Sequence, residues 1–535
     1  MKARVFGCFT LLLLATTAYA QKTGIRPLCD ENAPLCTETH EVYTYENKYT
    51  GHDEPSLLFY SNTPGSGNSS KYLMVLPNDP PRLPTSDGKG GTFNFQLHPA
   101  FWFGMALCDS QSAPNPGAAC PPDTDANIFD DADPASDHYI GKHPGTAFME
   151  MQFYPPGWVA WPPGNSCDST KWCAALNIDS LTTNLNTGIN NNATCLGITG
   201  IEPVNFAFIT KNGVPVGPPN PINSTLATFT PDPTKVLLMN SGDELLVDLR
   251  DTPDGFQVTI IDRTTGERGV MLASAANGFG QVKYDPAGTT CENIPYTYHP
   301  MYSTSSEHTR VPWAAHSYNV AFSDEIGHFE YCTQTDGNGG CLVAGPSDIG
   351  GVDADDAGCF DASQSTRIRI GGCLGTDVDF DGVPYQLTWP GTLLPPRTDR
   401  QFNPRSVLFT SPVFNGRRNY ERIAFETDLP RIEFATSPAC NRHTGVGCVN
   451  PPVGANFYPF FTTRNIETRF ADESCAWQLG GAHIPGTTNT FGGSSTAEYG
   501  GLLDSVYPAM GGSVHRINNF RQVLNNPCSS SLSDD

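Results

Sequence analysis

Several common sequence features are missing from this chain, and each absence removes a class of protein. After residue 20 there is no run of about 20 apolar residues, so the sequence predicts no membrane-spanning helix. No two cysteines stand in a CxxC pair, which argues against a structural zinc site. The patterns GxSxG and GxxxxGKS/T are also missing, so neither a nucleophile-elbow serine hydrolase nor a P-loop nucleotide enzyme is predicted.

Positive charge is scarce as well. The chain has 31 Lys and Arg residues against 55 Asp and Glu, which gives a net charge of −24 at pH 7. A field of this sign repels phosphate backbones and anionic membrane surfaces, so we expect neither nucleic acid nor a membrane as a partner. Neutral ligands and cations are the partners that fit this charge.

The N-terminal segment predicts export. Lys2 and Arg4 precede a short apolar run, and Ala18-Tyr19-Ala20 fits the small-x-small rule for signal cleavage. We therefore expect residues 1–20 to be a signal peptide and the mature protein to be secreted. Its other 515 residues, at this length, favour more than one domain.

Cysteine is plentiful, as in proteins of oxidising compartments. Of the 17 cysteines only Cys8 lies in the predicted signal peptide, and the even remainder, 17 − 1 = 16, favours disulfides over thiol catalysis. Proximity in sequence suggests six local pairs: Cys29/Cys36, Cys108/Cys120, Cys167/Cys173, Cys332/Cys341, Cys359/Cys373 and Cys440/Cys448.

Gly (52 residues) and Pro (46 residues) are abundant, and apolar residues come in short, partly alternating runs between turn-rich pieces. This pattern predicts an all-β protein of antiparallel β-sandwich or jelly-roll-like domains with little helix. Residues 242–269 predict a meander, and helical spacing occurs only within 501–524. The main predicted strands are 93–108, 147–154, 172–179, 204–210, 244–251, 256–262, 317–323, 327–332, 405–414, 422–428 and 431–437.

A change in composition suggests where the chain divides. From Cys332 to about Arg400 it is rich in Gly, Asp, Cys and Pro, which suits a linker held by ions and disulfides instead of an apolar core. We therefore predict an N-terminal β-sandwich region over 21–335, a linker over 336–400 and a smaller β-rich domain over 401–535.

The predicted linker contains a candidate calcium loop. "DVDFDGVPY" places carboxylates at Asp377, Asp379 and Asp381, just before Gly382. Oxygen ligands at alternate positions before a glycine that permits a sharp turn suit calcium. The segment resembles the loop start shared by EF-hands, dockerins and thrombospondin type 3 repeats, which implies these three aspartates as ligands.

The match to an EF-hand is incomplete, because Thr388 stands where that loop ends in a glutamate. An isolated, structural calcium loop is therefore the prediction. A second set of carboxylates, Asp353 and Asp355, lies upstream in "GVDADDAGC". Acidic turns on an acidic surface are the alternative interpretation of both segments.

Histidines gather in residues 299–330, at His299, His308, His316 and His328. The segment "IGHFEYC" resembles the strand that leads to the copper cysteine of cupredoxin-like folds, which implies a redox metal. That pattern needs a histidine shortly after the cysteine, and "CTQTDGNGGC" has none. Packed or surface histidines are the interpretation we prefer.

The segment "AFMEMQFY" (147–154) carries a carboxylate, Glu150, among apolar residues. On a strand Glu150 and Gln152 share one face, and the methionines share the other. In "CAALNID" the polar Asn177 and Asp179 share a face, and "VNFAFIT" adds Asn205. If the strands are neighbours, all five polar residues lie on one surface. Three tryptophans near the strand ends are candidate stacking platforms: Trp158, Trp161 and Trp172.

Amides and carboxylates beside flat rings suit a sugar, which has hydroxyls at its rim and C–H groups on its faces. Two carboxylates are also what glycoside hydrolysis requires, so Glu150 is the candidate acid/base and Asp179 its partner. Two alternatives remain: a solvated outer sheet face, and a non-catalytic protein that binds glycans or other proteins.

The calcium loop leads to a prediction. Because bound calcium would stabilise a segment that has little apolar core, EDTA should lower the melting temperature of the protein. The triple variant Asp377→Asn/Asp379→Asn/Asp381→Asn should melt at the same temperature with and without EDTA. An unchanged melting temperature of the unmodified protein in EDTA would count against the loop.

Overall fold

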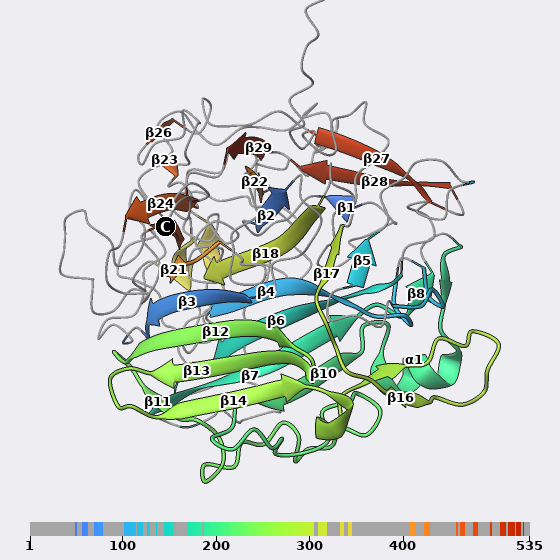
Figure 1. Ribbon diagram of the computed structural model, residues 1–535, viewed down its shortest axis with the longest axis horizontal. Coiled ribbons are helices and arrows are strands. Elements are labelled where there is room, and N and C mark those ends of the chain that lie inside the picture. Colours follow the sequence, from blue (N-terminus) through green and yellow to red (C-terminus); the bar gives the residue numbers. More distant parts are fainter. Residues whose placement is uncertain are drawn as a thin grey trace, which may run out of the picture.

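The computed structural model describes residues 101–120, 144–154 and 171–303 with short gaps, together with strands and a few neighbouring or single residues elsewhere between 49 and 528. Most of the β-strand residues belong to two large sheets, and the described part contains one short α-helix (Figure 1). The predicted all-β, mainly antiparallel class with little helix is confirmed. No helix in the described part is long and apolar enough to cross a membrane.

The first sheet has nine strands, and its order is β10-β7-β6-β4-β18-β2-β22-β29, with β11 also paired to β7. All its pairings are antiparallel. Its strands are β2 (Ser56–Ser61), β4 (Phe101–Cys108), β6 (Thr146–Tyr154), β7 (Lys171–Ser180), β10 (Val204–Phe208), β11 (Met239–Asn240), β18 (Thr309–Ser317), β22 (Arg422–Thr427) and β29 (Phe520–Asn525).

The second sheet has seven strands in the order β14-β13-β12-β3-β21-β25-β24. Its first three strands form the meander that the sequence predicts around residues 242–269. Its strands are β3 (Ser69–Val75), β12 (Glu244–Thr252), β13 (Gly255–Asp262), β14 (Arg268–Ala273), β21 (Leu408–Phe409), β24 (Phe461–Asn465) and β25 (Cys475–Leu479).

The two large sheets pack face to face. Tyr72 of β3 stacks on Phe103 of β4, with ring centroids 3.9 Å apart. Both side chains are fully buried, and so are the inward residues Met149 and Met151 of β6 and Val247 of β12. Burying one side chain of this size stabilises the fold by roughly 1.5–3 kcal/mol, so this contact holds the sandwich together.

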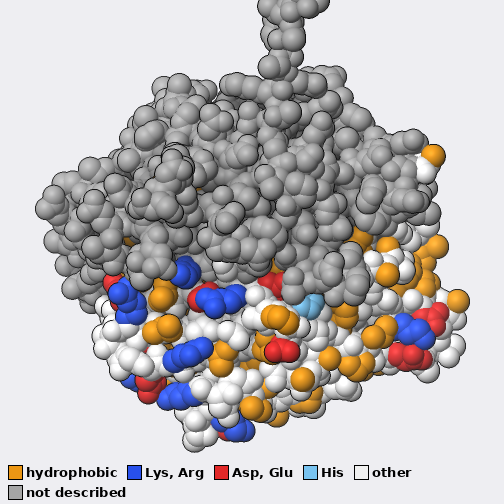
Figure 2. Space-filling model, in the orientation of Figure 1, with side chains coloured by type: hydrophobic (Ala, Val, Ile, Leu, Met, Phe, Trp, Pro, Cys, Tyr) orange, Lys and Arg blue, Asp and Glu red, His pale blue; other side chains and the backbone are white. Residues whose placement is uncertain are grey.

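The outer face of the seven-stranded sheet is partly solvated along β12, β13 and β14, whereas Leu73 of β3, Leu408 of β21 and Ala476 of β25 form a buried apolar cluster on it. Figure 2 shows acidic and basic side chains mixed with apolar ones on the face nearest the viewer. On β12 an Arg250 Nη2 atom lies 2.7 Å from Asp248 Oδ2, and Glu244 pairs with Arg263 at 3.3 Å. Such partly exposed pairs contribute about 0–1 kcal/mol each, as is usual for a solvated sheet face.

Smaller sheets complete the described part. The strands β1 (Tyr49–Thr50), β28 (Gly512–Asn518) and β27 (Leu503–Ala509) form a three-stranded sheet. Five two-stranded sheets pair β15 (Gly280–Val282) with β16 (Asn293–Pro295), β17 (Met301–Ser303) with β5 (Ala126–Ile128), β19 (Cys332–Thr335) with β20 (Cys341–Ala344), β23 (Asn456–Phe457) with β26 (Gly493–Ser494), and β8 (Thr183–Asn184) with β9 (Ile189–Asn190).

The expectation of helix within 501–524 was wrong. This segment forms the strands β27, β28 and most of β29. Strand β27 pairs along its whole length with β28, and β29 pairs with β22 of the nine-stranded sheet. Hydrogen bonding between strands outweighs the weak helical spacing there, because intrinsic helix propensity contributes little free energy compared with tertiary contacts.

Both large sheets take strands from early and late parts of the chain. Strand β2 pairs with β22, and β3 pairs with β21, across more than 330 residues of sequence. The predicted divisions at residues 335 and 400 stay a prediction. The sheets show that chain from both sides of those divisions is hydrogen-bonded together.

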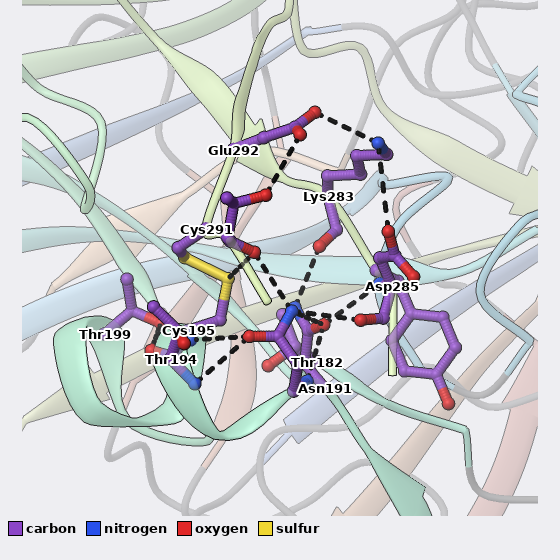
Figure 3. Close-up of a disulfide and its surroundings, with 12 residues drawn as sticks. Thr182, Asn191, Thr194, Cys195, Thr199, Lys283, Asp285, Cys291 and Glu292 are labelled. Carbon is purple, nitrogen blue, oxygen red and sulfur yellow. Dashed lines mark hydrogen bonds and ion pairs between the residues drawn. A yellow bond between two sulfur atoms is a disulfide. The ribbon is translucent and has the colours of Figure 1, made fainter. Parts of the chain in front are cut away.

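A disulfide fixes the helix α1 (Ala193–Thr199) to a distant loop. Cys195 of α1 is bonded to Cys291, 96 residues away (Figure 3). The helix starts at Asn192, whose side-chain oxygen accepts hydrogen bonds from the backbone N–H groups of residues 194 and 195, both 3.1 Å. The Asn192 amide nitrogen donates to the Asp285 and Thr290 carbonyls at 3.0 and 3.1 Å, so the cap also holds the loop.

The disulfides test the pairs suggested by proximity. Cys108–Cys120 is present as predicted, and Cys173 is also disulfide-bonded. Two further bridges, Cys195–Cys291 and Cys475–Cys528, join cysteines that proximity left unassigned. The other four predicted pairs have side chains outside the described part of the chain.

The long bridge leads to a stability prediction. Replacing both Cys195 and Cys291 by Ala should lower the free energy of unfolding by about 2–5 kcal/mol, because the unfolded chain gains entropy. The matched control is the Cys108→Ala/Cys120→Ala variant, whose bridge spans 12 residues. Its loss should be smaller by about 2 kcal/mol, from the ratio of loop lengths. Denaturant unfolding measures both, and an equal or larger loss in the control would contradict this account.

Candidate functional site

Four polar side chains lie together on the outer face of the nine-stranded sheet. The register of β6 and β7 places Glu150 directly opposite Asn177. Gln152 follows two residues along β6, and Asp179 follows two residues along β7, so alternation puts them on the same face. The sequence prediction that these four residues share one surface is confirmed.

Asn205 does not belong to this surface, so the expectation that it does was wrong. Its Cα partner on β7 is Ile178, which points to the inside of the sandwich. The Asn205 amide is buried there: its nitrogen donates to the Gly280 carbonyl at 2.9 Å and its oxygen accepts from the Gly280 N–H at 3.0 Å. Asn205 therefore joins β10 to β15.

Of the three tryptophans predicted as stacking platforms, only Trp172 is described by the structure. Trp172 lies on the inner face of β7 and is fully buried, and its indole N–H donates to Ser241 Oγ at 3.0 Å. Where it lies, Trp172 cannot stack on a ligand, because core packing surrounds it. Trp158 and Trp161 lie outside the described residues.

The outer face around Glu150 is covered, unlike the outer face of β12, β13 and β14 in the other sheet. Asn177 is only 5% exposed, and Glu150 itself is half-buried. Next to them an apolar cluster joins the sheet to the segment 214–238 that follows β10. Its members are Tyr154, Cys173, Ala175, Phe206, Phe208 and Val236, with Val216, Phe229 and Leu238 against them. The interpretation as a freely solvated face does not fit this burial.

A chain of side-chain hydrogen bonds runs along this face. The Asn177 amide nitrogen donates to the Tyr154 hydroxyl at 3.2 Å. The Tyr154 hydroxyl donates in turn to Gln152 Oε1. The Gln152 amide nitrogen then donates to Glu150 Oε2. We call these four residues the relay; its last acceptor is the carboxylate.

One atom of the relay has no partner. The side-chain oxygen of Asn177 is buried and accepts no hydrogen bond. A buried acceptor without a hydrogen bond lowers the stability of the fold by about 1–3 kcal/mol, so its presence here needs an explanation. An oxygen in this state is suited to a hydrogen-bond donor on a ligand.

Glu150 has the electrostatics of a proton donor. Burial raises the pKa of its carboxyl from 4.5 to about 7, because the charged form loses hydration. The hydrogen bond from Gln152 works the other way and stabilises the carboxylate. The negative charge of Glu202 raises the pKa of Glu150 further. At neutral pH the protonated and ionised forms of Glu150 are therefore both populated.

Glu202 and Tyr154 are the residues that sequence reasoning missed as members of this site. Glu202 precedes β10, and a hydrogen bond of 3.0 Å from the Ser180 N–H to the Pro203 carbonyl holds this segment beside the end of β7. Glu202 is two and four residues before Val204 and Phe206, and this even spacing was the sequence feature that could have placed it on their face of the sheet. Tyr154 has the strand parity of Glu150, but its link to Asn177 depends on the register of β6 and β7.

The structure tests neither the calcium prediction nor the redox-metal prediction. Asp353, Asp355, Asp377, Asp379 and Asp381 all lie outside the described residues. His299 is described, and its Nδ1 lies 2.9 Å from Asp251 Oδ1. Within the part of the chain that is described, no three His, Cys, Asp or Glu side chains are grouped to hold a metal ion.

Comparison with known proteins gives no family. No protein-family profile and no curated protein matches the chain. Among solved structures, the enzymatically active domain of tailspike protein 2 from bacteriophage CBA120 matches with 12% sequence identity and a TM-score of 0.16. That match covers 45% of this chain and 22% of the tailspike chain. A likeness at this level does not bear on the function.

The raised pKa of Glu150 predicts a pH-dependent stability. In the unfolded chain the pKa of a glutamate is about 4.3, so the folded state binds the proton more tightly and loses stability as the pH rises from about 4.5 to about 7. Gln cannot ionise, so the Glu150→Gln variant should gain stability relative to the unmodified protein across this window. The gain should be on the order of 2–3 kcal/mol.

Denaturant unfolding at pH 4.5 and pH 8 measures this difference. The matched control is Glu267→Gln, which changes an exposed glutamate on the turn between β13 and β14. The difference in the free energy of unfolding between Glu267→Gln and the unmodified protein should be similar at pH 4.5 and at pH 8. If Glu150→Gln also has the same effect at both, the pKa of Glu150 is not raised by folding.

Proposed function

We propose that this protein acts on an extracellular carbohydrate through the outer face around Glu150, with Glu150 as the general acid. One observation carries the proposal. A half-buried carboxyl with a pKa of about 7 stands on the same sheet face as a second carboxyl and an unsatisfied buried acceptor. Glycoside hydrolysis uses a proton donor of this kind and a second carboxylate together.

Asp179 is the first candidate for the second carboxylate. It is the diagonal neighbour of Glu150 on the adjacent strand, a position that separates Cα atoms by about 7–8 Å. Carboxyl groups about 5–10 Å apart serve retaining and inverting hydrolysis, and side chains that start from Cα atoms at this separation can reach that spacing. Its role would be that of nucleophile or base.

Glu202 is the second candidate. Its charge raises the pKa of the Glu150 carboxyl, although it is the smallest of the three influences on that pKa. If Glu202 is the partner, the same interaction keeps one of the two carboxyls protonated, as acid–base pairs require. Variants of each residue decide between the candidates.

Recognition of a sugar would fall to the polar side chains. The unpaired end of the buried Asn177 amide would form a hydrogen bond with a ligand hydroxyl, which would remove its desolvation cost. Gln152 is already bonded at both ends of its amide, so its role is to orient Glu150. Trp158 and Trp161 stay candidates for the stacking contact.

Export and calcium are parts of the same proposal. Disulfides between distant segments, such as Cys195–Cys291, persist in oxidising compartments and are compatible with a secreted protein. Calcium at the Asp377 loop would be structural and would stand apart from the chemistry at Glu150.

A hydrolysis screen over polysaccharides, read as reducing ends released, tests the function. Glu150→Gln should lower kcat by about 100- to 10,000-fold, because it removes the proton donor. Since the acid acts in its protonated form, activity should fall as the pH rises above about 7. Asp179→Asn and Glu202→Gln should differ, and the larger loss identifies the partner.

Glu267→Gln, far from this face, is the control and should keep full activity. Full activity in Glu150→Gln would remove that residue from the mechanism. If the unmodified protein binds glycans in the screen without releasing reducing ends, it is a binding protein and the hydrolytic role is wrong.

A further inference from the structure

The relay has a direction that its chemistry fixes. An ionised carboxylate can only accept, so Gln152 must turn its amide nitrogen toward Glu150. The Gln152 oxygen then faces Tyr154 and has to receive the phenolic proton. Because the Tyr154 hydroxyl already donates its proton in that hydrogen bond, its oxygen can only accept from Asn177. The Asn177 side-chain nitrogen therefore points toward Tyr154. The Asn177 oxygen is left over, as observed.

Protonation of Glu150 removes the condition that fixes this direction. A protonated carboxyl can donate to the Gln152 oxygen once that amide has turned over. The Gln152 nitrogen then donates to the Tyr154 oxygen, and the Tyr154 hydroxyl donates to the Asn177 oxygen. The Asn177 nitrogen becomes the unpaired end. One proton enters from solvent, two amides turn and one hydroxyl rotates, and no other bond changes.

We propose that the relay is a proton-controlled switch: the unpaired end of the buried Asn177 amide is a hydrogen-bond acceptor when Glu150 is ionised and a donor when Glu150 is protonated. The observed arrangement is the first of these two states. The switch shares its site with the proposed carbohydrate function, in which the Glu150 proton would leave its hydrogen bond to Gln152 when it is transferred to the substrate. The test of the switch needs no substrate.

The groups around Glu150 favour access to both states. Tyr154 lies on the same strand, Asp179 on β7, and Glu202 just before β10, while its partner on β4 is Gly104, which has no side chain. Among the described residues these are the titratable groups that face it. The charge of Glu202 opposes the ionised form of Glu150, and burial raises the pKa of the Tyr154 hydroxyl, so Tyr154 stays neutral and keeps its proton for the relay.

The switch limits the kind of ligand that can use Asn177. A hydroxyl group can both accept and donate, so it is bound in either state of the relay. A group of fixed polarity, such as an ammonium or a carboxylate, pairs with Asn177 in one state only. A neutral polyol is therefore the ligand class that tolerates a change in the protonation of Glu150 during a reaction.

Side-chain amide NMR of the full chain tests the switch. In protein labelled with ¹⁵N-asparagine, the Asn177 amide signals, assigned by their loss in Asn177→Ala, should shift between pH 5 and 9. The midpoint should lie near 7 and coincide with the titration of Glu150, followed in parallel by ¹³Cδ-glutamate labelling. In Glu150→Gln the Asn177 signals should not titrate.

The Tyr154→Phe variant separates the relay from a direct effect of charge. It removes only the hydroxyl from a buried ring, and an unchanged melting temperature would show that the fold is kept. In this variant Glu150 should still titrate and Asn177 should not. The Asn192 amide, which caps α1 and bonds to backbone groups, is the control within each spectrum.

Three results would overturn the switch. Titration of Asn177 that persists in Tyr154→Phe would mean that the Glu150 charge acts through space. A static Asn177 signal while Glu150 titrates would mean that the relay does not reverse. Absence of any Glu150 titration between pH 5 and 9 would remove the trigger. A protein inactive on every sugar would leave the switch untouched, so the two failures are distinguishable.

Discussion

The apolar contact between the two large sheets determines the direction of every side chain on β6 and β7. Successive side chains of a strand point to opposite sides, so burying Met149 and Met151 inside the sandwich forces Glu150 outward. The same holds on β7, where buried Leu176 directs Asn177 to the outer face. The polar groups are brought together by packing on the other side of the sheet. Hydrogen bonds among them then offset most of the cost of their burial.

Burial alone does not make a carboxyl functional, as Asp109 shows. Its pKa is also raised by burial, to about 6, but it lies inside the sandwich and is only 1% exposed. Its oxygens accept from Ser180 Oγ at 2.7 Å and from the Gln111 N–H at 2.8 Å, and these bonds join β7 to the turn after β4. Glu150 differs because it is half-buried, lies near other carboxyls and ends a relay with an unsatisfied atom.

Strand parity could be predicted from the sequence, and it located most of the candidate site. It could not say which face of β10 is inside. The apolar residues of β10, Phe206 and Phe208, pack outward under the segment 214–238, and the polar Asn205 is the inward residue. That inversion depends on a covering segment with no strand pattern of its own. The bridge Cys195–Cys291 was hidden for a related reason, because 96 residues separate its ends.

The pairing of early strands with late ones has a consequence for biogenesis. Strands β2 and β3 each need a neighbour that lies more than 330 residues further along the chain. Until those residues have been synthesised, both strands have an open edge with unpaired backbone groups. Such edges invite association with other chains, and contacts of this sequence separation form slowly. A host that produces this protein therefore has to keep a long, incomplete polypeptide from associating with other chains until its last strand has been made.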